Sequence, residues 1–433
     1  MQRVLVIAEA ANPDWVSVPL VGWNIAVALR GVADVHIVTQ VRNRAAFLSR
    51  GLVEGRDFTA IDSEAFAAPF YRLAEILRGG DGKGWTTITA MQSLAYPYFE
   101  HLVWRRFGNA IKAGKYDVVH RVTPLSPTAP SSLARRCRRA GVPFLLGPLN
   151  GGLPWHPDYG RERIKEREWL SYIRKAYAFL PTIRSTYANA SAIIAGSGHT
   201  SSELARYRRP MVYIPENGID TDRFGFHPRT RAQSDPLRLI FVGRLVPYKG
   251  ADIAIEACQG LLKTGRARLD IIGDGPEGLA LAMLVAKLGV EEAVTLHGWK
   301  SHAEVADYMR KADLMVFPSV REFGGGVVLE AMASGVVPIV VDYGGPGELV
   351  DNRSGFAIPI GPRDKLVRLV DRLTKTIVDG DHDLTAMSAA AANRVEQLYS
   401  WRAKANQIRG VYDWLRQGDG TVPDFGFSVC ANE

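Results

Sequence analysis

Two carboxylates and a run of glycines lie close together in the segment SVREFGGGVVLEAMASGVVPIVVDYGGPG, residues 319–347. Glu322 and Glu330 are separated by seven residues, and glycines 324–326 lie between them. A glycine loop that opens a helix favours anions, because its backbone N–H groups and the helix dipole point at the ligand. Carboxylates accept hydrogen bonds from hydroxyl groups. The segment therefore predicts a site for a phosphorylated, hydroxyl-rich ligand.

Two cations follow the apolar run LIFVG further towards the N-terminus. Arg244 and Lys249 lie in one predicted loop, next to Gly250. Such a loop can neutralise two phosphates that leave together, and fixed positive charge at a departing group lowers the barrier. The alternative is a surface arginine and lysine in a tight turn. We favour the phosphate site, because the glutamate pair accompanies it.

The glutamate segment resembles the Glu-x7-Glu motif of the family 4 retaining nucleotide-sugar glycosyltransferases. Three further segments resemble that family in the same order along the chain: IPENGIDTDRF (214–224), FVGRLVPYKG (241–250) and IIGDGPE (271–277). The resemblance implies an α/β protein with the GT-B fold, in which two doubly wound Rossmann-like domains face each other across a cleft. It also implies a nucleoside-diphosphate sugar as co-substrate.

The resemblance assigns roles to residues of this chain. Arg244 and Lys249 would contact the donor diphosphate, Glu322 the hydroxyls of the transferred sugar, and Glu330 the ribose hydroxyls. The predicted catalytic residues are Glu322, Arg244, Lys249 and His120. The predicted donor-binding residues are Gly22, Gly243, Phe323, Gly324, Gly325, Gly326, Val327 and Glu330. The segment EFGGGVVLE departs from the family pattern in its early aromatic residue and in a glycine where a bulky aliphatic residue is usual.

Two of these assignments rest on weaker patterns. Gly22 begins a predicted helix where the family has a glycine loop near the donor, although a single glycine also permits a close turn. His120 ends the strand YDVVH, and the family's second histidine position is Val122. A lone histidine at a strand end is commonly structural, so a structural role for His120 is the alternative to the catalytic one. The GPLNGG turn, residues 147–152, is expected near the acceptor.

No metal is predicted. Asp220 and Asp222 form an Asp-x-Asp pair, which holds a metal in a different glycosyltransferase fold. Here the pair lies in a segment that the resembled family uses structurally, and we expect it to make caps and turns. We expect no cofactor besides the nucleotide-sugar co-substrate. Arg244 and Lys249 would supply the positive charge that a metal ion would otherwise provide.

Short β-branched runs alternate with helical patterns along the chain, which predicts parallel sheets with helical crossovers. The predicted strands are RVLVIAEA, DVHIVTQ, YDVVHRVT, VPFLLGPL, ASAIIAGS, LRLIFVGR, LDIIGDG, VTLHG, DLMVFPS and VVPIVVD. The polar stretch PRTRAQSDP predicts a linker. We expect an N-terminal acceptor-side domain, 1–222, to which a crossover helix, 399–416, returns. The nucleotide-sugar domain would be 223–398, followed by a flexible tail, 417–433.

The net charge is +8 and the pI is about 9.3. No nucleic-acid-binding motif accompanies this charge, so we expect no nucleic acid partner. Residues 161–187 mix basic and aromatic side chains, typical of a solvated helix face or of docking on an anionic membrane surface. Three scattered cysteines, with no apolar run long enough to span a membrane and no signal peptide pattern, predict a cytoplasmic protein. The basic and aromatic stretch would place it peripherally on the inner face of the membrane.

The sequence thus predicts a retaining, metal-independent glycosyltransferase. It would move a sugar from a UDP- or GDP-sugar donor to a polysaccharide or lipid-linked glycan acceptor. Two alternatives are a nucleotide-sugar 2-epimerase of the same architecture and a catalytically idle glycosyltransferase-like binding protein. The sugar, the acceptor and the linkage are not encoded in a recognisable motif, and the choice of base would depend on contacts near residues 298–300.

Overall fold

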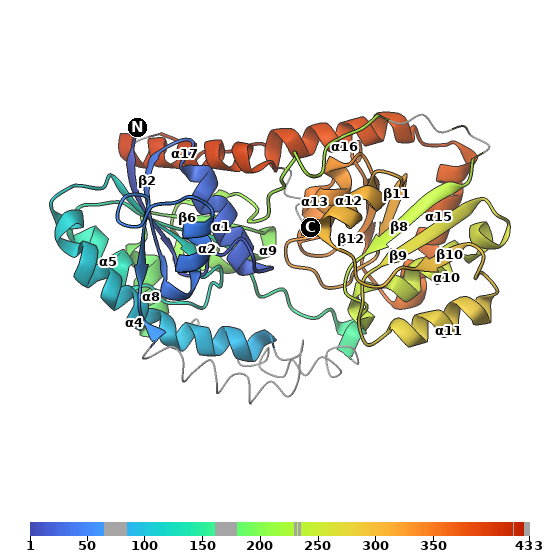
Figure 1. The fold of residues 1–433 in the computed structure, drawn as a ribbon, viewed down its shortest axis with the longest axis horizontal. Coiled ribbons are helices and arrows are strands. Elements are labelled where there is room, and N and C mark those ends of the chain that lie inside the picture. The colour runs from blue at the N-terminus through green and yellow to red at the C-terminus, as the bar shows by residue number, and fades with distance from the viewer. Residues whose placement is uncertain (65–84, 161–179, 229–231, 233–234, 419, 428–433) are drawn as a thin grey trace. The chain divides into compact units, whose positions relative to one another are not determined.

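The computed structural model describes residues 1–64, 85–160, 180–228, 232, 235–418 and 420–427. These residues form two compact units (Figure 1). The N-terminal unit contains residues 1–154, 180–216 and 401–427, and the C-terminal unit contains residues 155–160 and 217–400. The sequence prediction places the boundary after residue 222 and assigns residues 155–160 to the N-terminal domain, whereas the chain crosses after Glu216 and these six residues pack with the C-terminal unit.

The N-terminal unit is built on a parallel seven-stranded sheet in the order β3-β2-β1-β4-β5-β6-β7. Its strands are β1 (Arg3–Ala8), β2 (Asp34–Gln40), β3 (Phe58–Ile61), β4 (Val118–Thr123), β5 (Phe144–Leu149), β6 (Ala192–Ala195) and β7 (Met211–Tyr213). The strands β4, β5 and β6 are buried along their whole length, as in sheets covered on both faces. The short strands β3 and β7 are absent from the sequence prediction.

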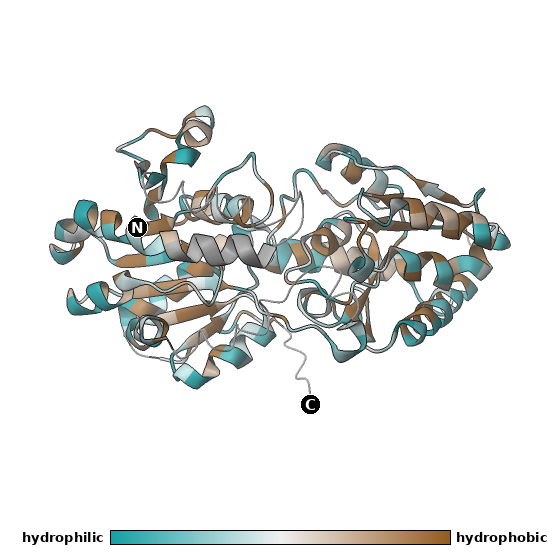
Figure 2. Cartoon of the chain, turned by 90° about the horizontal axis from the view of Figure 1, so that it is seen from below, coloured by the Kyte–Doolittle hydropathy of each residue, from teal (hydrophilic) through white to brown (hydrophobic). Residues whose placement is uncertain are grey.

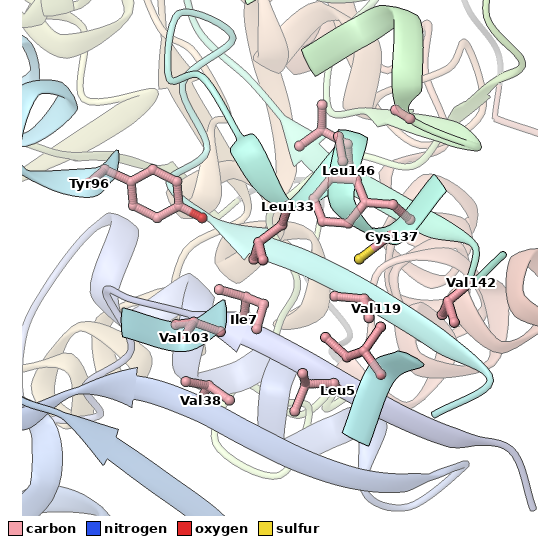
Figure 3. Close-up of a cluster of buried hydrophobic side chains, with 14 of the residues drawn as sticks. Leu5, Ile7, Val38, Tyr96, Val103, Val119, Leu133, Cys137, Val142 and Leu146 are labelled. Atoms are coloured by element: carbon pink, nitrogen blue, oxygen red, sulfur yellow. The ribbon is translucent and has the colours of Figure 1, made fainter. Parts of the chain in front are cut away.

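Helices cover both faces of this sheet. They are α1 (Val18–Leu29), α2 (Arg44–Ser49), α4 (Trp85–Lys112), α5 (Ser132–Arg139), α8 (Pro181–Asn189), α9 (Gly198–Leu204) and α17 (Trp401–Gln417), with 3₁₀ turns η1 (Val41–Asn43) and η4 (Ala205–Tyr207). The core under α4 and α5 gathers alternate strand residues such as Leu5, Ile7 and Val119, around Leu133 and Cys137 (Figure 3). The opposite face is covered by α1, against which α17 packs.

A buried carboxylate fixes α5 to α4. Glu100 of α4 accepts hydrogen bonds from the Ser131 hydroxyl and from the backbone N–H groups of Ser132 and Leu133, at 2.5, 2.6 and 3.3 Å. It therefore acts as the N-terminal cap of α5 from a neighbouring helix, where a negative charge also favours the helix dipole. Burial raises the pKa of this carboxyl above its ordinary value, and the hydrogen bonds oppose that shift.

The C-terminal unit holds a parallel six-stranded sheet in the order β10-β9-β8-β11-β12-β13. Its strands are β8 (Leu237–Val242), β9 (Ala267–Ile272), β10 (Val294–Leu296), β11 (Leu314–Phe317), β12 (Val337–Asp342) and β13 (Phe356–Pro359). The first five coincide with predicted runs, and β13 was not predicted. The two parallel sheets confirm the predicted α/β class.

Helices again cover both faces of the sheet, and Figure 2 shows hydrophobic strands inside hydrophilic outer helix surfaces. The helices are α10 (Ala251–Lys263), α11 (Gly278–Leu288), α12 (His302–Met309), α13 (Gly326–Ala333), α14 (Gly345–Leu349), α15 (Arg363–Asp379) and α16 (Leu384–Leu398). Two 3₁₀ turns, η2 (Pro157–Tyr159) and η5 (Pro247–Lys249), accompany them. A capping box between Ser301 and Glu304 begins α12.

The last helix, α17, begins at Trp401, directly after the predicted cap residue Ser400. Its buried residues include Ile408, Val411 and Tyr412, which is the apolar spacing expected from the sequence. Beyond α17, Phe427 is buried against Tyr213 and lies 4.9 Å from the Lys404 ammonium. The predicted linker and the predicted flexible tail fall partly outside the described residues.

Candidate donor-binding site

The predicted donor residues lie in three loops that leave neighbouring strands of the C-terminal sheet. One loop follows β8 and carries Arg244 and Lys249, the next follows β11 and carries Glu322, and the third joins β12 to α14. The carboxyl ends of parallel strands meet at one edge of a sheet, which is where α/β folds bind ligands. Backbone bonds tie the loops together, since Val320 N–H donates to Tyr248 O at 2.9 Å and Gly345 N–H to Glu322 O at 3.2 Å.

An ion pair links the two predicted catalytic segments. The Lys249 ammonium donates a hydrogen bond to the Glu322 carboxylate, across 73 positions of sequence. Their side chains are 17% and 19% exposed, so both can still be reached by a ligand. Arg244 lies exposed on the same loop as Lys249. The structure thus brings together a cation and a carboxylate that the sequence places far apart.

The glycine segment between the two glutamates makes the turn into α13. Gly325 precedes the helix with a left-handed φ of 62°, a conformation that favours glycine. Gly345 lies against this loop so closely that a Cβ atom there would be 2.2 Å from Phe323 O. Gly326 and Val327 form the first turn of α13, and Glu330 follows one turn later. The spacing of the motif therefore places both glutamates beside the start of one helix.

A second glycine turn supports the loop that carries Arg244. A Cβ atom on Gly273 would lie 1.9 Å from Gly243 O, and one on Gly275 would lie 2.4 Å from Leu245 O. Backbone bonds join the same segments, because Gly243 N–H donates to Ile272 O and Leu245 N–H to Asp274 O. The IIGDGPE segment therefore positions the Arg244 loop by close backbone contact.

Glu330 is held in surroundings that disfavour its charge. Desolvation raises the pKa of its carboxyl to about 7, and the positive charge of Arg223 opposes the shift. Arg223 comes from the NGIDTDRF segment, which was expected from the sequence to have only a structural role. The carboxyl of Glu330 therefore changes its protonation state near neutral pH, whereas an ordinary glutamate is ionised well below it.

We predict that donor affinity depends on pH through Glu330. Below pH 7 the carboxyl is protonated, and above pH 7 the carboxylate is a stronger acceptor for ribose hydroxyls, by about 1 kcal/mol. The dissociation constant should therefore fall roughly three- to fourfold as the pH rises from 6 to 8, because the carboxyl is only partly titrated at each of these two pH values. Titration calorimetry on the wild type and on Glu330→Gln would check this. A Glu330→Gln variant that keeps the full pH dependence would assign it to another group.

Gly22 has a packing reason to be glycine. It is buried in α1, and a Cβ atom there would lie 2.2 Å from Ala10 O and 2.8 Å from Thr123 Cγ2. The close approach of α1 to the ends of β1 and β4 therefore requires this residue. This observation supports the alternative of a close turn, and donor contact by Gly22 stays a prediction.

His120 ties three elements of the N-terminal unit together. Its Nε2–H donates to Gly147 O at 2.6 Å, and its Nδ1 accepts from the Tyr412 hydroxyl of α17 at 2.6 Å. The residue is fully buried, and desolvation lowers its pKa to about 4, so the ring is neutral. Both ring nitrogens are thus engaged by the protein. The structure favours the structural alternative for His120 over the predicted catalytic one.

Replacing Tyr412 with phenylalanine should separate these two roles. The variant leaves Nδ1 of His120 buried without its donor, which should lower the free energy of unfolding by about 1–2 kcal/mol. If His120 is structural, kcat should not change. Urea unfolding and steady-state kinetics would check both expectations, and a fall in kcat without a loss of stability would restore the catalytic role.

Asp220 makes a turn, as predicted. Its carboxylate accepts from the backbone N–H of Asp222 at 3.1 Å, and its carbonyl accepts from Phe224 N–H at 3.1 Å. Within the described ranges, no group of three histidine, cysteine or acidic side chains is arranged to hold a metal ion. The absence of a required metal stays a prediction.

An aromatic group beside the ion pair was not predicted from the sequence. Trp155 lies in residues 155–160, a short segment of the first half of the chain that belongs to the C-terminal unit. Its ring contacts Tyr248 and the guanidinium of Arg321, the residues that directly precede Lys249 and Glu322. No local pattern marks Trp155, because its contacts depend on chain segments that are distant in sequence.

Comparisons with known proteins fit this architecture. Residues 222–390 match the family model described as glycosyl transferases group 1. The amylovoran biosynthesis glycosyltransferase AmsK of Erwinia amylovora is 29% identical over 212 residues, which are 47% of this chain and 51% of the relative. The putative colanic acid biosynthesis glycosyltransferase WcaL of Salmonella typhimurium is 30% identical over 256 residues, 57% of this chain and 60% of the relative. The chain therefore spans about half the length of these curated relatives.

Solved structures extend the likeness to nearly the whole chain. The crystal structure of HepE from Anabaena in complex with UDP has a TM-score of 0.58 and 16% identity, and the match covers 95% of this chain and 100% of that one. This likeness confirms the predicted GT-B fold. The match to the group 1 family model confirms the predicted resemblance to glycosyltransferases. The finer assignment to family 4 stays a prediction.

Proposed function

We propose, from the premise that residues 222–390 carry the group 1 glycosyl transferase pattern, that this protein is a retaining glycosyltransferase that uses a nucleoside-diphosphate sugar. The observation that carries the proposal is the Lys249–Glu322 pair at the glycine turn that opens α13. A cation for phosphate and a carboxylate for hydroxyls meet there, with Glu330 one turn into the helix. A donor of the UDP or GDP type has both kinds of group.

Each residue then has a chemical task. Arg244 and Lys249 stabilise the negative charge that grows on the departing diphosphate, which is the largest contribution expected in such a site. Glu322 orients the transferred sugar through its hydroxyls, and Glu330 holds the ribose. The N-terminus of α13 adds its dipole to the positive potential. The protein thus lowers the barrier by orientation and by fixed charge.

The proposal places no covalent nucleophile among these residues. The acceptor hydroxyl attacks the face from which the diphosphate leaves, and a phosphate oxygen assists its deprotonation, so the configuration is retained. Arg244 and Lys249 supply the charge that a metal supplies in other folds, and we propose metal-independent transfer with no cofactor beyond the co-substrate. Transfer that persists in a chelator would support this part.

A thermal-shift screen against UDP-, GDP-, ADP- and dTDP-sugars tests the donor site first. A donor at roughly 100 times its dissociation constant should stabilise the protein by about 2.7 kcal/mol. Arg244→Ala should reduce the shift, and product analysis with an acceptor separates transfer from 2-epimerisation of the free donor. A wild type that binds no donor would favour the idle binding protein.

The acceptor is proposed to be a polysaccharide or a lipid-linked glycan at a membrane surface. AmsK and WcaL are named for amylovoran and colanic acid biosynthesis, which supports a glycan acceptor. The membrane hypothesis was based on the basic and aromatic side chains of residues 161–187, and residues 161–179 of this stretch lie outside the described residues. The described helices α4, α5 and α8 supply a separate observation, and no described helix is long and apolar enough to cross a membrane.

Exposed basic side chains lie on these three neighbouring helices. Among the described side chains of α4, α5 and α8, the one acidic residue is Glu100, which is buried. This basic face consists of Arg105, Arg106, Lys112, Arg135, Arg138, Arg139 and Arg184. Trp104 lies between two cations of the same helices, 5.6 Å from the Lys112 ammonium and 5.3 Å from the Arg136 guanidinium. The charge of this face complements an anionic lipid surface. A cytoplasmic protein docked on the inner membrane face fits it.

We predict that the basic face binds anionic vesicles. Replacing Arg135, Arg138 and Arg139 with serine should weaken binding by about 3 kcal/mol, or roughly 100-fold, at about 1 kcal/mol for each charge. The matched control replaces three exposed cations of α15, Arg368, Arg372 and Lys375. Vesicle sedimentation with and without an anionic phospholipid would check this, and equal losses in both variants would leave only net charge as the cause.

A further inference from the structure

A short segment from the first half of the chain packs on the C-terminal unit beside the proposed donor site. Within residues 155–160, the Tyr159 hydroxyl donates to Gly361 O at 2.8 Å. The His156 ring lies 5.9 Å from the ring of Tyr343, the residue that follows β12. The contacts of His156 and Tyr159 attach the segment to the C-terminal unit, and they thereby fix the position of Trp155, its first residue.

Trp155 contacts two different loops. Its ring meets the Tyr248 ring edge-on, with centroids 5.7 Å apart and planes at 88°. The Arg321 guanidinium lies over Trp155 at 4.7 Å and over Phe323 at 5.0 Å, so two aromatic rings hold one cation. Arg321 is only 9% exposed. Stacking on aromatic faces is a favoured environment for a desolvated guanidinium.

The two residues that Trp155 contacts are the sequence neighbours of the Lys249–Glu322 ion pair. Tyr248 directly precedes Lys249, and Arg321 directly precedes Glu322. The two loops are also joined by the bond from Val320 N–H to Tyr248 O. Trp155 therefore bridges the residues that come immediately before each member of the Lys249–Glu322 pair.

We infer that Trp155 is a positioning residue for the donor site, which sets the separation of Lys249 and Glu322 through Tyr248 and Arg321. The inference rests on the proposed function, in which these two residues take the diphosphate and the sugar. A donor needs both groups at a fixed separation, and a displacement of about 1 Å can cost roughly 100-fold in rate. Trp155 acts through its two neighbours and does not itself touch the donor in this scheme.

The test compares Trp155→Ala with Trp155→Phe, using the nucleotide sugar that stabilises the wild type most. Trp155→Ala should lower kcat/KM roughly 10- to 100-fold and weaken donor binding roughly tenfold. Trp155→Phe keeps a flat ring for both neighbours and should recover to within about threefold of the wild type. The matched control is Trp414→Ala, which removes another half-buried tryptophan, from α17 of the other unit. It should leave donor affinity unchanged.

A second variant covers the case in which Trp155→Ala does not fold. Arg321→Leu keeps an aliphatic side chain between the rings but removes the stacked cation, and it should weaken donor binding to a similar extent. Unchanged donor affinity and KM in folded Trp155→Ala or Arg321→Leu would overturn the inference, as would a failure of Trp155→Phe to recover. A wild type that binds no donor would overturn the proposed function as well, which distinguishes the two failures.

Discussion

Replacing Lys249 with alanine is expected to lower kcat by about 10²- to 10³-fold. The ammonium lies beside Glu322, at the end of the loop that also carries Arg244. In the proposed reaction it stabilises charge that develops mainly in the transition state, so its loss should affect kcat more than donor affinity. The variant also leaves the Glu322 carboxylate without this cation, which adds a repulsive charge next to the diphosphate.

Steady-state kinetics at saturating donor would measure this effect. Lys249→Arg keeps the positive charge and should retain more activity than Lys249→Ala, although its fork geometry differs. Lys375→Ala is the matched control, because Lys375 also forms an ion pair, with Asp371 on the exposed surface of α15 in the same unit. That control should leave kcat unchanged. A Lys249→Ala enzyme with wild-type kcat would remove Lys249 from the proposed mechanism.

Replacing Gly273 with alanine is expected to have the largest effect on stability. Gly273 has a φ of 143°, and a Cβ atom would lie 1.9 Å from Gly243 O. The clash is with backbone, which cannot rotate away, so the free energy of unfolding should fall by about 3 kcal/mol or more. Donor binding should fall too, because the loop that must move carries Arg244.

Urea unfolding would give the loss of stability, and a thermal-shift titration would give the loss of donor affinity. Gly260→Ala is the control, because Gly260 lies in α10, where an added Cβ atom would meet no heavy atom within 4 Å. Alanine should stabilise the protein there by about 0.5–1 kcal/mol. A Gly273→Ala variant as stable as the wild type would show that the turn relaxes without disturbing the loop.

The ten predicted strands are all present in the structure, because most of them are largely buried and appear as apolar runs, and the partly exposed β10 still carries β-branched residues. The missed strands β3, β7 and β13 have three or four residues and are each only partly buried, so the apolar run that marks a fully buried strand is short or interrupted in them. The chain crossings are also hard to predict. A local pattern does not show that residues 155–160 pack with a unit whose main part begins at residue 217.

Arg244, Lys249 and Glu322 could be placed near one another from the sequence, because they lie in loops that follow the neighbouring strands β8 and β11. Their binding of a donor stays a prediction. The partners of His120 had no such signal. They lie 27 and 292 positions away, and only the folded chain shows that both ring nitrogens are occupied. Trp155 and Arg223 were missed for the same reason, since each acts on a residue that is remote in sequence.

The return of α17 to α1 has a consequence for how the protein is made. The ribosome completes the C-terminal unit when residue 400 emerges, but the N-terminal unit, begun first, still lacks α17. Until then the buried face of α1 and the Nδ1 atom of His120 remain without Ile408, Val411 and Tyr412. Domains usually fold in the order of their synthesis. Here the unit that starts first is finished after the C-terminal unit, so the nascent chain keeps an apolar surface exposed until residues 401–417 have emerged.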